Sequence, residues 1–501
     1  MPPPRCAVEP APPRDAADGR QEREETMTRQ WAAGPRRMAA GVAIALLGLA
    51  APAPVGAQGS GGAGGPGALP GGPGASRPAE ETRPAAPSPF AQTRLLGDLG
   101  GLRTRLLDRG VDLRLGYIGE FGGNVTGERT GAGYAGQIAF SADIDWGKLA
   151  DVTGFSTHFA IVNRQGNNLS RFAMRDNYMQ SAEIYGAGFN MGLHLVAFYA
   201  RQKLLDDRID VAVGRMPVAL DFAASPFGCF PIGLQGCGNP RALSNNAQFT
   251  SWPQSTWGGR VRVTSSAETY VQLGAYESKP FPGGGRTGWS WDTGTATGVI
   301  VPVEFAWEPA FGAEKLPGHY KVGFAYDSSD FDSLYRNASG GPLLLAGQTP
   351  AVTSGRRQFW VVADQMLLRH GPGPDTGLTL VGHYGNSTGG NSITWRTAWG
   401  GLYDKGFWRS RPNDAVMLTV GWWGVSHQLG DLQLQQQALG LPLANGAAHP
   451  QHNEYAIELD YIMPVHPGVT IEPAVQYFIH PNADARLKNA FVFAGRLTID
   501  F

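Results

Sequence analysis

The last eleven residues of the chain, Phe491 to Phe501, constrain its fold more than any other segment. Their sequence, FVFAGRLTIDF, places an apolar residue or glycine at every second position counted back from the aromatic carboxyl terminus. The intervening positions include Arg496, Thr498 and Asp500. Because successive side chains of a strand point to opposite faces, one face of this segment is apolar and the other carries polar groups. A transmembrane β-barrel needs this division, since its outer face meets lipid and its inner face meets water.

The same alternation recurs along the chain from Gly110 onward. An even number of strands brings both termini to one side of the membrane, and each segment has about the length that a tilted strand needs to cross. A soluble β-sandwich or a lipocalin-like barrel is the alternative, but its outer face would be polar. The sequence therefore predicts an all-β, single-chain, transmembrane antiparallel β-barrel over residues 94–501, with a short helical segment near 95–109. Its sixteen predicted strands are 111–121, 137–146, 154–165, 190–202, 208–217, 257–265, 268–277, 297–308, 319–328, 356–369, 376–385, 392–404, 414–426, 453–463, 468–480 and 487–501.

Three segments are predicted ahead of the barrel. Residues 27–57 are interpreted as a signal peptide, because a pair of arginines precedes a short apolar run and a small-residue cleavage site. Residues 1–26 are rich in proline and charge, and we interpret them as a misassigned or untranslated extension ahead of the initiator Met27. Residues 58–93 consist mainly of Gly, Ala, Pro and Ser, so they hold too little apolar surface to fold and are predicted to form a disordered linker.

The charge balance and the cysteines narrow the partners. Beyond residue 57 the chain has 34 basic and 36 acidic side chains and no basic run, which argues against nucleic acid as a partner. Cys229 and Cys237 are an even pair in an exported chain, so they are predicted to form a disulfide. A metal site is the alternative for this pair, but no other ligands lie nearby in the sequence.

Charged residues on the polar faces of several predicted strands indicate a hydrated lumen. A dry interior would leave such charges unpaired at a large free-energy cost. We expect pore-lining or constriction groups among the charged residues of these faces and of the segment between the strands at 208–217 and 257–265. The candidates are Arg260, Arg262, Arg396, Glu472 and Asp221.

The segment between the strands at 208–217 and 257–265 has about 40 residues without alternation. A long loop of this kind is usually functional or disordered, and the predicted disulfide within it favours order. We expect it either to fold into the barrel and narrow the channel or to lie on the extracellular surface.

Several of these segments resemble the carbohydrate-selective porins of the OprB family. The stretch LLGDLGGLRTRLLDRGVDLRLGYIGEFGGN at 95–124 is similar to the family's start, with Leu99 where a Trp is usual. A second similar stretch contains VGRMPVALDFAASPFGCF at 213–230 and SWPQSTWGGRVRV at 251–263, with paired cysteines in the same place. The terminal Phe501 resembles the signal of bacterial outer-membrane barrels that the assembly machinery reads. The resemblance covers roughly 95–501.

This resemblance implies a sixteen-stranded channel of the bacterial outer membrane for the passive diffusion of mono- or oligosaccharides into the periplasm. Outer-membrane lipid, lipopolysaccharide and the assembly machinery are the further partners that it implies. It gives no catalytic residue, cofactor or metal.

Two other functions are weighed against the channel. The segment at 385–389 matches Gly-x-Ser-x-Gly, so an outer-membrane hydrolase of lipase or esterase type with Ser387 and His383 as its reactive pair is one alternative. That motif acts only at a strand-to-helix turn, whereas predicted strands flank it here. A structural or adhesive barrel with a closed lumen is the other alternative.

Overall fold

The computed structural model describes residues 94–501, apart from 187–189, 247–248, 280–287, 290, 292–294, 347–348, 372 and 390. The three segments predicted ahead of the barrel, 1–26, 27–57 and 58–93, lie outside the described residues. No helix in the described part of the chain is long and apolar enough to span a membrane.

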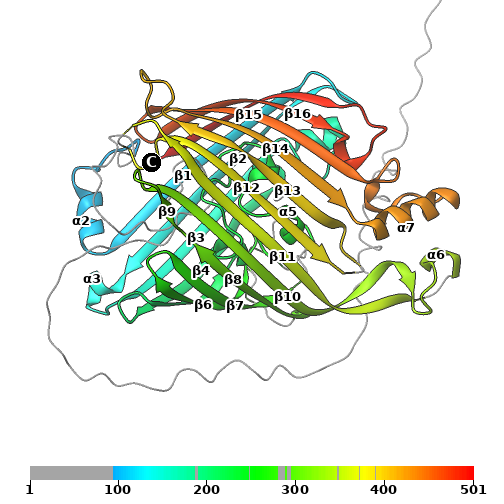
Figure 1. Ribbon diagram of the computed structural model, residues 1–501, viewed down its shortest axis with the longest axis horizontal. Coiled ribbons are helices and arrows are strands. Elements are labelled where there is room, and N and C mark those ends of the chain that lie inside the picture. Colours follow the sequence, from blue (N-terminus) through cyan, green and yellow to red (C-terminus); the bar gives the residue numbers. More distant parts are fainter. Residues whose placement is uncertain are drawn as a thin grey trace, which may run out of the picture. The chain divides into compact units, whose positions relative to one another are not determined.

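Sixteen long antiparallel strands close into a barrel, as predicted (Figure 1). β1 pairs with both β2 and β17, with Tyr117 opposite Ile138 on one side and Ile499 on the other, and this double pairing closes the sheet. A further two-residue strand, β9 (Ala310–Phe311), pairs only with the start of β10. The sixteen strands are β1 Val111–Asn124, β2 Gly131–Asp145, β3 Phe155–Gly166, β4 Met191–Leu204, β5 Ile209–Met216, β6 Thr256–Ser266, β7 Thr269–Ser278, β8 Gly298–Trp307, β10 Leu316–Asn337, β11 Pro350–Arg369, β12 Gly377–Thr388, β13 Thr394–Lys405, β14 Ala415–Val425, β15 Asn453–His466, β16 Val469–Ile479 and β17 Ala490–Asp500.

The alternation in the terminal strand has the predicted orientation. Phe493 is 55% exposed and Val492 is fully buried, although the two are neighbours in β17. The apolar side chains at every second position therefore face the lipid. The other face, which includes Arg496 and Thr498, points into the barrel and is buried.

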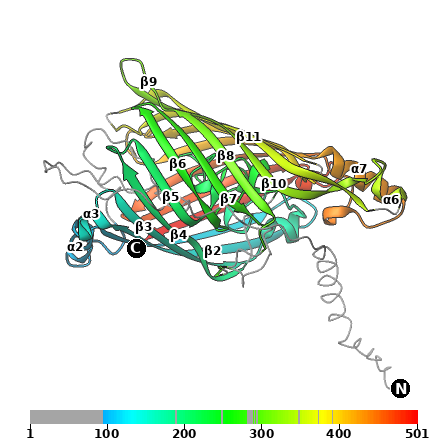
Figure 2. The same cartoon turned by 90° about the horizontal axis from the view of Figure 1, so that it is seen from below.

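The hairpin of β10 and β11 extends well beyond its predicted segments. β10 and β11 have 22 and 20 residues, whereas their predicted segments were 319–328 and 356–369. The two-residue period continues in β10, but the outward residues change from Val322, Phe324 and Tyr326 to Ser328 and Asp330. This hairpin therefore continues past the apolar band of the barrel, on the side of α6 and α7 (Figure 2).

Helices lie at both ends of the barrel. The predicted amino-terminal helical segment is α2, which lies with α3 near the carboxyl terminus, whereas α6 and α7 lie at the opposite end (Figure 1). Arg103 of α2 donates to the Phe501 carbonyl oxygen at 2.8 Å, and the Phe501 N–H extends the β17 ladder to the Leu115 carbonyl at 2.9 Å. The first and last strands of the barrel, β1 and β17, begin and end at the side of α2 and Phe501, which is the periplasmic end of a barrel of this kind. The helices are α2 Leu102–Asp108, α3 Trp146–Ala150, η2 Ser170–Met174, α4 Glu183–Gly186, η3 Val218–Leu220, η4 Leu234–Gly236, α5 Arg241–Ser244, α6 Leu343–Ala346, α7 His427–Ala438, η5 Ala444–Gly446 and η6 Pro481–Ala483.

Candidate functional site: the charged wall and the inward loop

The segment between β5 and β6, here called the inward loop (217–255), folds into the lumen. Its backbone bonds to side chains on opposite walls: Ala223 N donates to Glu304 of β8 at 2.8 Å, and Gly233 N donates to Glu458 of β15 at 2.8 Å. Ala242 N also donates to Thr397 of β13 at 3.0 Å. Of the two positions expected for this segment, the structure shows the inward one.

The cysteines of the inward loop form the predicted disulfide. Cys229 and Cys237 are bonded to each other across eight positions of sequence. Both sulfurs are used in this bond, so neither supplies a thiolate to a metal. The Cys229 Sγ–Cys237 Sγ bond closes a small ring in the part of the loop that lies against β15, β16 and β17.

Apolar side chains of the inward loop fill part of the barrel interior. Phe222 and Leu243 are fully buried, and they belong to one cluster with Tyr276, Ile300 and Trp360 from the inner faces of β7, β8 and β11. The lumen is therefore narrowed by packed side chains as well as by polar ones. This packing also fixes the position of Asp221, which immediately precedes Phe222.

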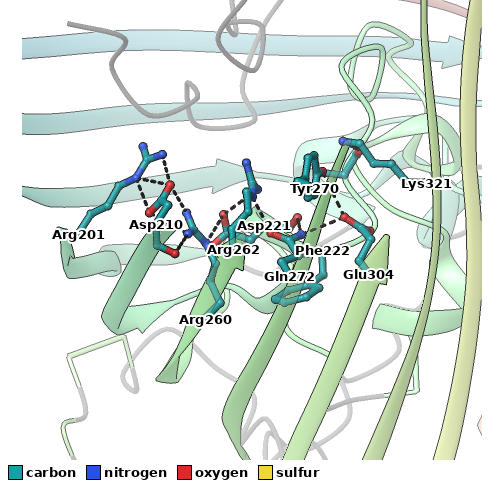
Figure 3. Close-up of polar contacts among 12 residues, drawn as sticks. Arg201, Asp210, Asp221, Phe222, Arg260, Arg262, Tyr270, Gln272, Glu304 and Lys321 are labelled. Carbon is teal, nitrogen blue, oxygen red and sulfur yellow. Dashed lines mark hydrogen bonds and ion pairs between the residues drawn. The ribbon is translucent and has the colours of Figure 1, made fainter. Parts of the chain in front are cut away.

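A row of alternating charges, here called the charged wall, runs along the inner face next to the loop (Figure 3). Its members are Arg201 of β4, Asp210 of β5, Arg260 and Arg262 of β6, and Asp221 of the inward loop. The Arg201 Nε–Asp210 Oδ2 distance is 2.8 Å, and the Arg260 Nη1–Asp210 Oδ1 distance is also 2.8 Å. Asp221 Oδ1 lies 3.1 Å from Arg260 Nε and 3.7 Å from Arg262 Nη2.

Strand register explains why these residues meet. Arg201 pairs with Ala212 in the β4–β5 ladder, Ala212 pairs with Arg260 in the β5–β6 ladder, and Asp210 pairs with Arg262. Residues that face each other in a ladder point to the same side of the sheet. All four charged strand residues of the wall therefore project into the lumen, where Asp221 reaches them from the loop.

Polar groups extend the wall toward β8 and β10. Arg262 Nε donates to Gln272 Oε1 at 2.9 Å, and Gln272 Nε2 donates to Glu304 Oε1 at 2.9 Å and to the Asp221 carbonyl at 2.7 Å. The Arg262 guanidinium carbon also lies 4.3 Å from the centre of the Tyr270 ring. Lys321 Nζ donates to the Ala224 carbonyl at 3.0 Å. Figure 3 shows Lys321 at the end of the row where Tyr270 and Glu304 lie.

The members of the wall differ in their access to the lumen. The Arg262 side chain is 23% exposed and those of Arg201 and Asp221 are each 13% exposed, whereas that of Arg260 is only 4% exposed. Arg260 therefore holds the row together. Arg262, Arg201 and Asp221 remain able to exchange hydrogen bonds with a hydroxylated molecule in the lumen.

Glu472 lies in a different group. It points into the barrel from β16, where Arg496 Nη1 is 3.4 Å from Glu472 Oε2, and Arg496 Nη2 is 2.7 Å from Glu120 Oε1. Arg496 also donates to the carbonyl oxygens of Cys229, Phe230 and Pro231 at 2.9, 3.1 and 3.0 Å. The structure thus brings Arg260, Arg262 and Asp221 together and places Glu472 beneath the inward loop.

Arg396 does not line the lumen, so its prediction as a pore residue is corrected. In β13 an extra residue separates the pair Thr394–Val425 from the pair Arg396–Gly424. Such a bulge reverses the alternation, because every later side chain changes face. Arg396 pairs with Asn386 on the outer face of the barrel, whereas Thr394 and Thr397 point inward.

Several residues of the wall were not among the predicted site residues. Arg201, Asp210, Gln272, Glu304 and Lys321 all occupy inward positions of predicted strands. Their signal was a charged or amide group between outward apolar neighbours, as for Asp210 between Ile209 and Val211. This signal marks the lumen side, but it does not show which of the many inward polar groups lie near the loop.

The geometry does not support the hydrolase alternative. Ser387 and His383 both point inward from β12 but are four residues apart, which is about 13 Å along a strand. A nucleophile and its base need to be within hydrogen-bond reach. His383 instead stacks on Trp399 with ring centres 5.1 Å apart.

Comparison with known proteins identifies the family. Residues 129–501 match the family model described as carbohydrate-selective porin, OprB family. The chain is 30% identical to Porin B of Pseudomonas aeruginosa over 409 residues, which are 79% of this chain and 89% of the relative, and 26% identical to the putative porin QuiX of Acinetobacter baylyi over 81% of this chain and 93% of the relative. The high-pH structure of Pseudomonas putida OprB is similar with a TM-score of 0.77 and 29% identity, covering 82% of this chain and 99% of that one. The chain therefore belongs to the OprB family of carbohydrate-selective porins and is a sugar channel of the bacterial outer membrane.

Proposed function

We propose that sugars cross this channel by passive diffusion along the charged wall, through the space that the inward loop leaves open. One observation carries the proposal: Asp221 of the loop lies within ion-pair distance of both Arg260 and Arg262 of β6. The loop and the wall are thereby held together, so the polar groups that remain accessible beside this contact face the path of the solute.

The chemistry of the wall suits neutral, hydroxyl-rich solutes. Arg262 and Arg201 offer N–H donors, and Asp221 offers carboxylate acceptors. Positive and negative groups alternate along the row. An uncharged sugar loses less solvation free energy than an ion does on leaving bulk water to approach it. Binding has to stay weak enough for the sugar to leave, as in other selective pores.

Single-channel recording of the purified protein in planar bilayers tests this proposal. We expect an open channel whose current is blocked by sugars in a concentration-dependent way. Liposome swelling with a graded series of neutral sugars, and with an anionic sugar of matched size, should show faster uptake of the small neutral sugars. Arg262→Gln should weaken the sugar block, whereas Arg396→Gln on the outer face is the matched control and should leave it unchanged.

Two results would contradict the proposal. Absence of conductance would favour a barrel with a closed lumen. Uptake that depends only on solute size, with no effect of Arg262→Gln on the block, would show that the charged wall does not contact the sugar.

Phe501 is proposed to serve as the signal that the outer-membrane assembly machinery reads. Its backbone N–H pairs with Leu115 only after β17 has closed against β1, so the aromatic terminus is free before the barrel closes. Deletion of Phe501 should reduce the amount of folded protein in the outer membrane. Asp500→Asn keeps the chain length and the aromatic terminus, so it is the control and should leave that amount unchanged. An unchanged outer-membrane yield after deletion of Phe501 would contradict this role.

A further inference from the structure

Two arginines lie on the outer face of the barrel at the end away from α2 and Phe501. Arg357 of β11 pairs with Thr388 of β12, and Arg396 of β13 pairs with Asn386 of β12. These partners belong to the outward-facing set of β12, so both arginines lie on the side that meets the membrane. Toward the middle of these strands the outward residues are apolar, as for Phe359 and Val361 in β11 and Leu380 in β12.

The arginines sit immediately beyond a row of aromatic side chains. Two residues nearer the membrane centre, the outward positions are Phe359 in β11 and Tyr384 in β12, and Trp422 occupies the corresponding outward position of β14. Below them follow aliphatic residues such as Val361 and Val420. Aromatic residues of this kind mark the boundary between hydrocarbon and headgroups. The two arginines are therefore at headgroup level in the outer leaflet.

Local contacts hold the Arg396 guanidinium in place. Its central carbon lies 3.7 Å from the centre of the Trp395 ring, and Trp395 in turn lies beside His427 with ring centres 4.8 Å apart. With its amide oxygen turned toward them, Asn386 accepts from Arg396 Nε at 3.2 Å and from Trp395 Nε1 at 3.3 Å. The bulge that turns Arg396 outward also brings Trp395 next to it.

Neither arginine is neutralised by the protein within the described part of the chain. No carboxylate there forms an ion pair with Arg357 or Arg396. Asp330 lies further out on the same face of β10, where it accepts from the Ser354 hydroxyl at 2.6 Å. Two unpaired guanidinium groups at the level of lipid headgroups would attract an anion.

We propose that Arg357 and Arg396 form a binding site for the phosphate groups of lipopolysaccharide, the phosphorylated glycolipid of the outer leaflet. One strand separates them, and their partners on it are two residues apart, so their Cα atoms are about 12 Å apart by standard sheet spacings. Flexible side chains at that spacing can both reach the headgroup of one lipid. Guanidinium groups match phosphate geometry with paired N–H donors, and Phe359 and Tyr384 lie where the acyl chains begin.

Binding of defined lipids to the purified, full-length barrel tests this site. The probes are lipid A with both phosphates, lipid A from which the phosphates have been removed, and phosphatidylglycerol, each titrated against the protein in detergent and followed by native mass spectrometry. We expect the phosphorylated lipid A to bind most tightly. Equal binding of the dephosphorylated form, or tighter binding of phosphatidylglycerol, would overturn the proposal.

Charge-removing variants locate the site. A basic residue near a membrane surface contributes about a fivefold factor in affinity, so the double variant Arg357→Gln with Arg396→Gln should bind phosphorylated lipid A about 30-fold more weakly. Lysine at both positions keeps the charge but not the paired N–H donors, so it should recover only part of the affinity. Arg105→Gln, which removes the same charge from the exposed surface of α2 at the opposite end, is the matched control and should bind like the unaltered protein.

The sugar block provides the check that the variants are folded. Because both arginines lie on the outer face, the double variant should keep the conductance and sugar block of the unaltered channel. Unreduced binding of phosphorylated lipid A by such a conducting double variant would overturn the proposal while leaving the sugar-channel function intact. Failure of the sugar block in the unaltered protein would instead contradict the proposed path along the charged wall.

Discussion

Two inward-facing arginines, Arg262 of β6 and Arg496 of β17, lie on different parts of the barrel wall and differ in what surrounds them. Arg262 has Asp221, Gln272 and the Tyr270 ring as neighbours, and 23% of its side chain remains exposed. Arg496 contacts two carboxylates and three loop carbonyl groups, and only 1% of its side chain is exposed.

This difference separates two uses of charge inside one lumen. Around Arg496 the charges hold the inward loop against β1, β16 and β17, so their interactions are completed within the protein. Around Arg262 the interactions are incomplete, and a solute can add to them. The position of the loop therefore determines which inward charges are structural and which remain available to the sugar. Strand alternation alone gives both arginines the same inward direction.

The largest expected effect is that of Arg496→Met. This change removes the positive partner of Glu120 and Glu472, both of which are about 1% exposed, and it releases three carbonyl groups of the loop. Breaking a buried ion pair from one side costs about 3–5 kcal/mol. Thermal unfolding in detergent, followed by circular dichroism, should show a marked loss of stability. Arg262→Met is the matched control, and an equal loss for both variants would contradict the distinction between them.

Removing the disulfide should have the next largest effect. The double variant Cys229→Ser with Cys237→Ser opens a small ring, and the chain-entropy relation for a loop of this length gives about 2–3 kcal/mol. We expect the inward loop to detach more readily near Arg496, which would increase current fluctuations in single-channel records. The reduced form of the unaltered protein should behave in the same way. If current fluctuations do not increase in either the double variant or the reduced protein, the contacts with the barrel wall are sufficient to hold the loop.

Asp221→Asn tests the contact between the loop and the charged wall. Arg260 keeps Asp210 as a partner, but its Nε loses Asp221 and Arg262 loses its carboxylate, so we expect about 1–2 kcal/mol of lost stability. The accessible wall becomes more positive by one charge. The reversal potential in a salt gradient should therefore shift toward anion preference. Asp330→Asn on the outer face is the control, and a similar shift there would contradict a specific role of Asp221.

The alternation of side chains was sufficient to predict the barrel and its sixteen strands. It also placed Arg260, Arg262 and Glu472 correctly on inward faces, because the register shifts of their strands lie closer to the strand ends than these residues. It failed for Arg396, because one extra residue in β13 reverses which side chains face inward. The alternating sequence pattern does not reveal this bulge. It also missed the length of β10, whose period continues beyond the apolar band.

The division between structural and accessible charges could not be predicted from the sequence. It depends on contacts such as that of Arg496 with Glu120, which are 376 positions apart, and on where the inward loop places its carbonyl groups. Local patterns carry no information on such pairs. The resemblance in the loop sequence suggested the family, but it did not show which inward charges the loop contacts.

The smallest effect on stability, and the most informative one on transport, is expected for Arg262→Gln. Its side chain is the most exposed of the charged wall and its ion pair with Asp221 is long, at 3.7 Å, so its contribution to folding should be at most about 1 kcal/mol. A hydrogen bond between a sugar hydroxyl and a charged donor is stronger, so the concentration of sugar needed for half block should rise by about three- to tenfold. Arg262→Lys keeps the charge but loses the Nε donor to Gln272. Its half-blocking sugar concentration should lie between those of the unaltered protein and Arg262→Gln. If Arg262→Gln leaves the sugar block unchanged while Arg496→Met alters it, the sugar passes beside Arg496. The roles assigned to the two arginines must then be exchanged.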